Sequence, residues 1–254
     1  MVLRRIVLGC VLALLVIGIT ACGGGARSEA EPLDYRADAD ELVIFADENT
    51  SPGGFMIGQE CNHIPRLRIW GDGRTIFTEM VEGVRQVRVG QMPAETIDAI
   101  LAKLDEMDYF ENPPENTMNP NGTGYRLSVH LVSDSHESFW SELNNLYPAV
   151  FEPIDSTALS NFVPEKGYLV IGPRLKQDAF QDAPEWPAEF SKRLSDPATS
   201  GREVSGEELD FLWNAVNRQP EPLTGIRDGD GIYAVALFIE GISMAEPPFR
   251  CWNK

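Results

Sequence analysis

The chain has 254 residues, of which 43% are apolar, and it carries 39 aspartates and glutamates against 21 lysines and arginines. This content is typical of a globular protein, because it is too apolar for a disordered chain and too polar for a protein with many membrane spans. The formal net charge of −18 argues against a nucleic-acid partner, because lysine and arginine drive phosphate binding.

The N-terminal segment has the features of an export signal. Arg4 and Arg5 provide its positive start, and residues 6–21 form a stretch of 16 apolar and small residues. A helix that crosses a bilayer needs about 20 residues. The length therefore predicts a signal peptide at residues 1–21.

The end of this segment, Ile19-Thr20-Ala21-Cys22, resembles the lipobox of bacterial lipoproteins. The resemblance implies cleavage before Cys22 and lipidation of its thiol, with fatty acids such as palmitate as the membrane anchor. The expected location is the cell envelope, on the extracytoplasmic face of the membrane. The alternative is an ordinary signal peptide, or an uncleaved anchor, with an incidental cysteine.

The residues after Cys22 predict a tether. Residues 22–40 are rich in glycine, alanine and acidic residues, a composition typical of a flexible linker. Cleavage removes two arginines and no acidic residue, so the formal charge becomes −20. Anionic headgroups repel such a surface, and membrane attachment is expected to depend on the acyl chains.

Two cysteines remain for the folded body, Cys61 and Cys251. Outside the cytoplasm two such thiols most often pair. The disulfide would close a loop of 190 residues and stabilise the fold by up to about 5 kcal/mol in the chain-entropy model. The alternative is zinc at Cys61 and His63, but zinc needs two more ligands, and His130 and His136 are the remaining histidines. We expect no metal and no cofactor.

Hydrophobic periodicity predicts several strands and one helix in residues 41–150. The expected strands are 41–46, 67–70, 74–78, 84–89 and 125–131. Asp72-Gly73 predicts a hairpin turn between the second and third of them. Pro93 opens a helix, whose apolar stripe is Ile97, Ile100, Leu101 and Leu104. Residues 112–124 are expected to form a long loop.

Residues 165–254 repeat part of this order. A strand is expected at 167–172. Ser205 and Glu208 form a capping-box pattern before a second apolar stripe. A loop with Gly225, Gly229 and Gly231 then precedes an alternating strand at 233–239. The repetition indicates either a duplicated helix-loop-strand unit or two unrelated amphipathic helices, and the stripe is too generic to decide.

These elements predict an α+β fold of antiparallel sheets with inserted amphipathic helices. The halves 41–150 and 165–254 form either one domain or two, with residues 147–164 as the candidate boundary.

The segment 65–77, with Trp70-Gly-Asp-Gly73 at its turn, is similar to a strand-turn-strand of actinobacterial and Chloroflexi-like lipoproteins. Their C-terminal halves also share a Trp-Pro pair, here Trp186-Pro187, and a proline shortly before a cysteine, here Cys251. The shared motifs are structural. The resemblance therefore implies a lipoprotein and no particular activity.

No short catalytic motif occurs in the sequence, which lacks Gly-x-Ser-x-Gly, His-Glu-x-x-His, a phosphate loop and a dinucleotide fingerprint. We therefore predict no catalytic residue. His130 and His136 are either a proton-transfer pair or two solvent-facing residues. Asp228 and Asp230 are either calcium ligands or parts of a glycine-rich turn.

The five tryptophans divide by their expected surroundings. Trp70, Trp140 and Trp213 lie in expected regular elements and are expected to pack in the core. Trp186 and Trp252 lie in irregular segments and are expected to be more exposed.

Together these patterns predict a non-catalytic binding or interaction module on a lipid tether. Its partner would be a protein, a small molecule or a polymer, and the acidic surface favours a cationic or neutral one. The alternative is a carboxylate-dependent hydrolase of envelope or extracellular polymers, because such enzymes leave no short motif.

Overall fold

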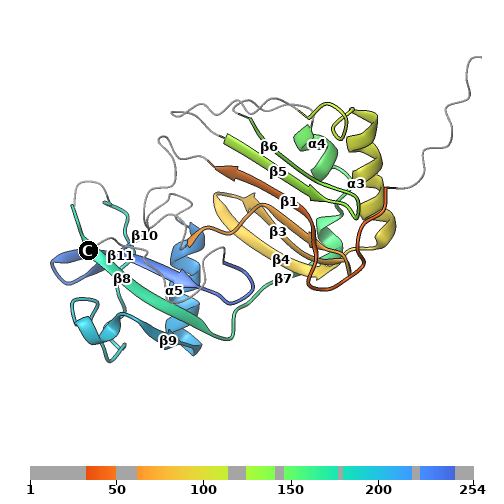
Figure 1. The fold of residues 1–254 in the computed structure, drawn as a ribbon. Coiled ribbons are helices and arrows are strands. Elements are labelled where there is room, and N and C mark those ends of the chain that lie inside the picture. Colours follow the sequence, from red (N-terminus) through yellow and green to blue (C-terminus); the bar gives the residue numbers. More distant parts are fainter. Residues whose placement is uncertain are drawn as a thin grey trace, which may run out of the picture. The chain divides into compact units, whose positions relative to one another are not determined.

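The computed structural model describes residues 33–49, 62–113, 124–140, 146–176, 180–218 and 224–243. In these residues two antiparallel sheets combine with inserted helices, which confirms the predicted α+β class (Figure 1). None of the helices in this part of the chain is long and apolar enough to cross a membrane.

The first sheet is built from residues 42–161. Its strands are β1 (Leu42–Asn49), β2 (Leu67–Trp70), β3 (Arg74–Val81), β4 (Val84–Gln91), β5 (Gly124–His130), β6 (Ser135–Trp140) and β7 (Ser160–Asn161). Their spatial order is β6-β5-β1-β2-β3-β4-β7, and every neighbouring pair is antiparallel. The strands β1 to β5 formed near the predicted positions, because their apolar residues alternate or run continuously, whereas β6 and β7 were not predicted.

The predicted hairpin between β2 and β3 is confirmed. Leu67 lies opposite Phe77, and Oδ1 of Asp72 accepts a hydrogen bond of 2.9 Å from the backbone N–H of Arg74. Gly73 has a φ of 87°, and a Cβ there would lie 2.4 Å from the carbonyl oxygen of Met92. Glycine is therefore required at this turn.

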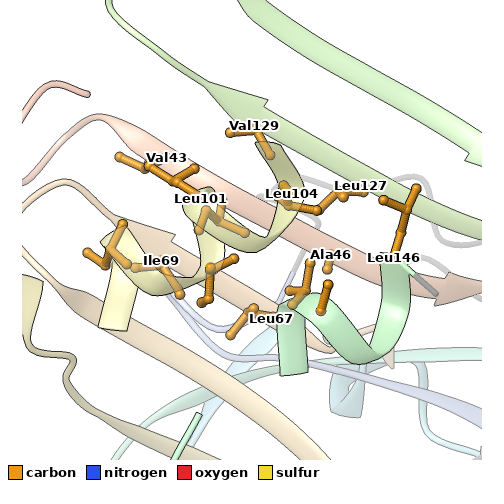
Figure 2. Close-up of a cluster of buried hydrophobic side chains, with 14 of the residues drawn as sticks. Val43, Ala46, Leu67, Ile69, Leu101, Leu104, Leu127, Val129 and Leu146 are labelled. Carbon is orange, nitrogen blue, oxygen red and sulfur yellow. The ribbon is translucent and has the colours of Figure 1, made fainter. Parts of the chain in front are cut away.

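Two helices, α3 (Ala94–Glu106) and α4 (Leu146–Phe151), cover one face of the first sheet (Figure 1). Pro93 is the N-cap of α3, and the predicted apolar stripe of this helix is fully buried. Figure 2 shows Leu101 and Leu104 of α3 near Val129 of β5, and Leu146 of α4 in the same cluster. We call this cluster the first core.

Part of the segment predicted as a tether lies against the folded body. Leu33 and Tyr35 pack on the first core. The backbone of Arg36 is so close to Gly71 that a Cβ on that glycine would meet the Arg36 carbonyl oxygen at 1.7 Å. Residues 33–40 therefore belong with the body, and the predicted tether keeps only residues 22–32, which lie outside the described residues.

The second sheet is built from residues 167–238. Its strands are β8 (Gly167–Leu175), β9 (Arg202–Val204), β10 (Thr224–Asp228) and β11 (Gly231–Phe238), in the spatial order β10-β11-β8-β9. Two short 3₁₀ helices, η1 (Ser156–Ala158) and η3 (Pro197–Thr199), lie in the connections.

The helix α5 (Gly206–Arg218) contacts β4, β10 and β11. Its buried Leu209 and Leu212 share a cluster with Ile76 and Val87 of the first sheet, and we call this cluster the second core. Glu208, predicted to close a capping box, accepts a hydrogen bond of 2.9 Å from Nη1 of Arg202 and pairs with it as an ion pair.

Two local predictions in this half are wrong. Gly225 lies inside β10 and not in a loop, where it faces Phe180 so closely that a Cβ would be 2.7 Å from the ring. Trp186 is buried, donates a hydrogen bond of 2.8 Å to the Lys192 carbonyl and packs edge-on against Phe211. Both outcomes depend on contacts with residues distant in sequence.

The order of one helix and two strands recurs as α3-β5-β6 and α5-β10-β11, and each strand pair is an antiparallel hairpin. The hairpins are placed differently, because β5 lies inside its sheet and β6 at the edge, whereas β10 is the edge strand and β11 lies inside. The two halves therefore share the order of these elements along the chain, but not the place of the hairpin in its sheet.

Candidate functional site

The face of the first sheet opposite α3 and α4 is divided into an apolar part and a polar part. On β3 and β4 it carries Ile76 and Val87 of the second core. On β1, β2 and β5, the alternation of side chains and the strand register place Asp47, Arg68 and Ser128 on this face. The titratable side chains of Asp47 and Arg68 therefore lie on this face, over β1 and β2.

The central contact is between Asp47 and His63. Nε2 of His63 lies 2.6 Å from Oδ2 of Asp47, and Oδ1 of Asp47 accepts a hydrogen bond of 2.9 Å from the backbone N–H of Glu48. The Asp47 side chain is 8% exposed and that of His63 is 23% exposed. A buried carboxylate thus orients an imidazole that solvent still reaches.

Asn62, the residue before His63, is held by the second sheet. Its Nδ2 donates to the carbonyl of Val235 at 2.8 Å and lies 3.3 Å from Oγ1 of Thr224. Its Oδ1 accepts a hydrogen bond of 2.8 Å from the backbone N–H of Leu237. The position of His63 therefore depends on β10 and β11, whereas Asp47 belongs to the first sheet.

Arg85 of β4 binds the same segment. Its Nε donates to Oδ1 of Asn217 in α5 at 2.9 Å, and its Nη2 donates to the Asn62 carbonyl at 3.0 Å. Burial lowers the pKa of Arg85 to about 10, and the charge of Asp47 opposes this effect. The guanidinium thus joins β4, α5 and the peptide that carries His63.

Arg68 of β2 lies on the same sheet face as Asp47. Its Nη2 donates to the carbonyl of Ile242, and its guanidinium carbon lies 5.5 Å from the centroid of the Trp70 ring. In the described residues its Nε is buried and has no hydrogen-bond partner. Burial lowers the pKa of Arg68 to about 10, Asp47 opposes this, and Arg74 adds to it.

We call Asp47, Asn62, His63, Arg68 and Arg85 the Asp47 cluster. In the part of the chain that the structure describes, neither Arg68 nor Arg85 forms an ion pair with a carboxylate. Asp47 is the carboxylate whose charge acts on both. With His63 neutral, the cluster carries one excess positive charge in a chain of net charge −18.

The chemistry of this cluster is that of hydrogen bonding and charge. Among the described residues the His63 ring bonds only to Asp47, so no hydroxyl or thiol is paired with it as a nucleophile. Such a pair within hydrogen-bond distance is one common way to activate a nucleophile. The arrangement is instead suited to holding a polar or charged group.

The other two histidines do not form a pair. His136 lies opposite Val129, and His130 lies opposite Ser135, so the two rings point to opposite faces of the sheet. The His136 ring packs edge-on against Phe110, with centroids 5.1 Å apart. Nδ1 of His130 lies 2.9 Å from Oγ of Ser135.

Asp228 and Asp230 serve different roles in the β10-β11 turn. Asp228 is buried, its Oδ2 accepts a hydrogen bond of 2.7 Å from the backbone N–H of Leu194, and it pairs with Arg193. The Asp230 side chain is 95% exposed. Within the described ranges, no three His, Cys, Asp or Glu side chains are grouped to hold a metal ion.

The remaining candidates of the sequence are placed as follows. Trp70 and Trp213 are half-buried and pack on the second core. Cys22, Cys61, Cys251 and Trp252 lie outside the described residues, as does the side chain of Trp140. The proposed lipidation and disulfide therefore keep the status of predictions.

The Asp47 cluster was not predicted from the sequence, apart from His63 as a metal-ligand alternative. Its signals are weak: Asp47 follows an apolar run in β1, and Arg68 alternates with Leu67 and Ile69. An alternating charge is also typical of a solvated sheet face. Comparison with protein-family models, with curated proteins and with solved structures found no match for this chain.

Proposed function

We propose that this protein is a lipid-anchored extracytoplasmic binding module. The lipobox-like segment that ends at Cys22 supports the location. The Asp47 cluster supports binding, because it places partly buried charged groups on a sheet face and, within the described ranges, pairs no nucleophile with its imidazole. This cluster is the observation that carries the proposal.

The positions of the buried acids favour binding over the hydrolase alternative. Asp47 and Asp228 are the two buried carboxylates of the described residues, and they belong to different sheets. Each accepts hydrogen bonds, from His63 and from the Leu194 N–H respectively. A paired-carboxylate hydrolase requires two carboxyl groups about 5–10 Å apart, one of them kept protonated.

The binding function is tested with the full-length protein, purified from membranes and incubated with envelope polymers and soluble extract of the producing cell. We expect it to retain material without releasing polymer fragments, as measured by mass spectrometry. Fragment release that disappears in Asp47→Asn, and persists in the exposed control Asp230→Asn, would overturn the proposal.

The anchor is tested separately by fractionating cells that produce a Cys22→Ser variant. We expect the parent to sediment with membranes and to incorporate labelled palmitate, and the variant to do neither. Stable anchoring needs two acyl signals, and the serine variant lacks the thiol that accepts the lipid. Equal retention of parent and variant in the membrane fraction would contradict the anchor.

A further inference from the structure

We propose that the Asp47 cluster binds a carboxylate group of its ligand, which Arg68 and His63 receive. The inference rests on the proposed binding function and names the ligand chemistry. The acidic composition of the chain favours a cationic or neutral partner. The Asp47 cluster is locally positive, and it therefore favours an anionic group.

The charges of the cluster match a single anionic group. Arg68 and Arg85 carry two positive charges, and Asp47 supplies one negative charge. Among the described residues, one partly buried guanidinium charge is left without a compensating carboxylate, and such burial is costly. A monoanionic carboxylate neutralises the excess, whereas a dianionic phosphate would bring a second negative charge.

The hydrogen bonds of Arg68 leave one arm of its guanidinium for a ligand. The bond from Nη2 to the Ile242 carbonyl fixes the plane of the group. The Nε–H is buried without a partner among the described residues, so the arm open to a ligand is Nη1, which forms no hydrogen bond within those residues. Carboxylates accept two parallel bonds from such a planar fork, and these charge-assisted bonds are about twice as strong as neutral ones.

His63 is placed to supply a second contact. The Asp47 carboxylate accepts hydrogen bonds, so Nε2 of His63 donates to it. The other ring nitrogen, Nδ1, becomes a donor when the imidazole is protonated. In that form the ring offers a bound carboxylate a donor that Asp47 does not occupy.

The three histidines of the chain make the test specific. The full chain in detergent is titrated with N-acetylalanine, and the ring protons of His63, His130 and His136 are followed by NMR. We expect a saturable shift of His63 alone, and no shift with the uncharged N-acetylalanine amide. Equal shifts with the amide, no shift at all, or a shift with inorganic phosphate only would overturn the inference.

Substitutions of Arg68 test whether the NMR shift of His63 depends on this arginine. Arg68→Gln should weaken N-acetylalanine binding at least about tenfold, because it removes a charge-assisted contact. Arg174→Gln is the control, since Arg174 lies in the second sheet, is more than half exposed and pairs with Asp230. Should Arg68→Gln fail to fold, Arg68→Lys keeps the charge, loses the fork and should still bind several-fold more weakly. Unchanged binding in a folded Arg68 variant would contradict the inference.

The two proposals fail separately. Retention of envelope material without fragment release, combined with no response to N-acetylalanine, leaves the binding module intact and removes the carboxylate assignment. Fragment release that depends on Asp47 removes the binding module itself.

Discussion

Asp47 and His63 are 16 residues apart in the chain, yet their side chains meet at 2.6 Å on one face of the first sheet. The contact requires β1 to present Asp47 and the bonds of Asn62 to β11 to hold the neighbouring peptide. The carboxylate acts on three groups at once: the imidazole of His63 and the guanidinium groups of Arg68 and Arg85.

Removing the charge of Asp47 should destabilise the fold. In Asp47→Asn, His63 loses its charged hydrogen-bond partner, and Arg68 and Arg85 lose a carboxylate charge that acts on both, so we expect a loss of about 2 kcal/mol in the free energy of unfolding. Urea denaturation measures it. The exposed Asp210→Asn should stay within about 0.5 kcal/mol of the parent. Equal stability of Asp47→Asn and the parent would show that the two arginines do not need this charge.

Asn62 should contribute more to stability than an exposed asparagine. Its buried side chain bonds to Val235, Thr224 and Leu237, so Asn62→Ala leaves buried backbone groups without partners. We expect a cost of about 2–4 kcal/mol, measured by thermal or urea unfolding. Asn112→Ala, an exposed control, should cost less than about 0.5 kcal/mol. A similar small effect at both positions would show that the hydrogen bonds of Asn62 do not stabilise the fold.

Tyr109 should make the fold sensitive to alkaline pH. Its hydroxyl donates to the Leu127 carbonyl at 3.3 Å, and burial raises its pKa from 10.0 to about 12. The folded state favours the neutral phenol, so this contribution is complete below pH 10 and is lost as the pH rises through 12. Between pH 9 and pH 11.5, Tyr109→Phe should lose less stability than the parent, as measured by urea unfolding. A parallel loss in both proteins would contradict this assignment.

We further propose that Cys61 and Cys251 form a disulfide. Both lie outside the described residues, but Asn62 follows Cys61 and Ser243 precedes Cys251 by eight residues. Ile64 and Ile242, close to these two ends, both belong to the second core. An extended segment of eight residues spans up to about 28 Å, which limits how far Cys251 can lie from Ser243. Non-reducing peptide mapping should find the two cysteine peptides linked, whereas two alkylatable thiols would contradict the bond.

Local patterns were sufficient for most of the regular elements. The stripe of α3 and the Asp72-Gly73 turn were predicted correctly, because helix amphipathicity and turn conformation are set by residues close in sequence. Trp186 and Gly225 were predicted incorrectly. Their surroundings come from Phe211 and Phe180, and no local pattern contains those contacts.

The sequence by itself determined the predicted export signal, the α+β class and the helical and strand periodicities, since each depends on a continuous stretch of residues. Only the tertiary structure decided the Asp47 cluster. Its members come from β1, β2, β4 and the segment before β2, and in the sequence each has the appearance of a solvated polar residue. Strand order and the hydrogen bonds of Asn62 bring these residues together. In this arrangement the charge of the Asp47 carboxylate acts on the partly buried guanidinium groups of Arg68 and Arg85.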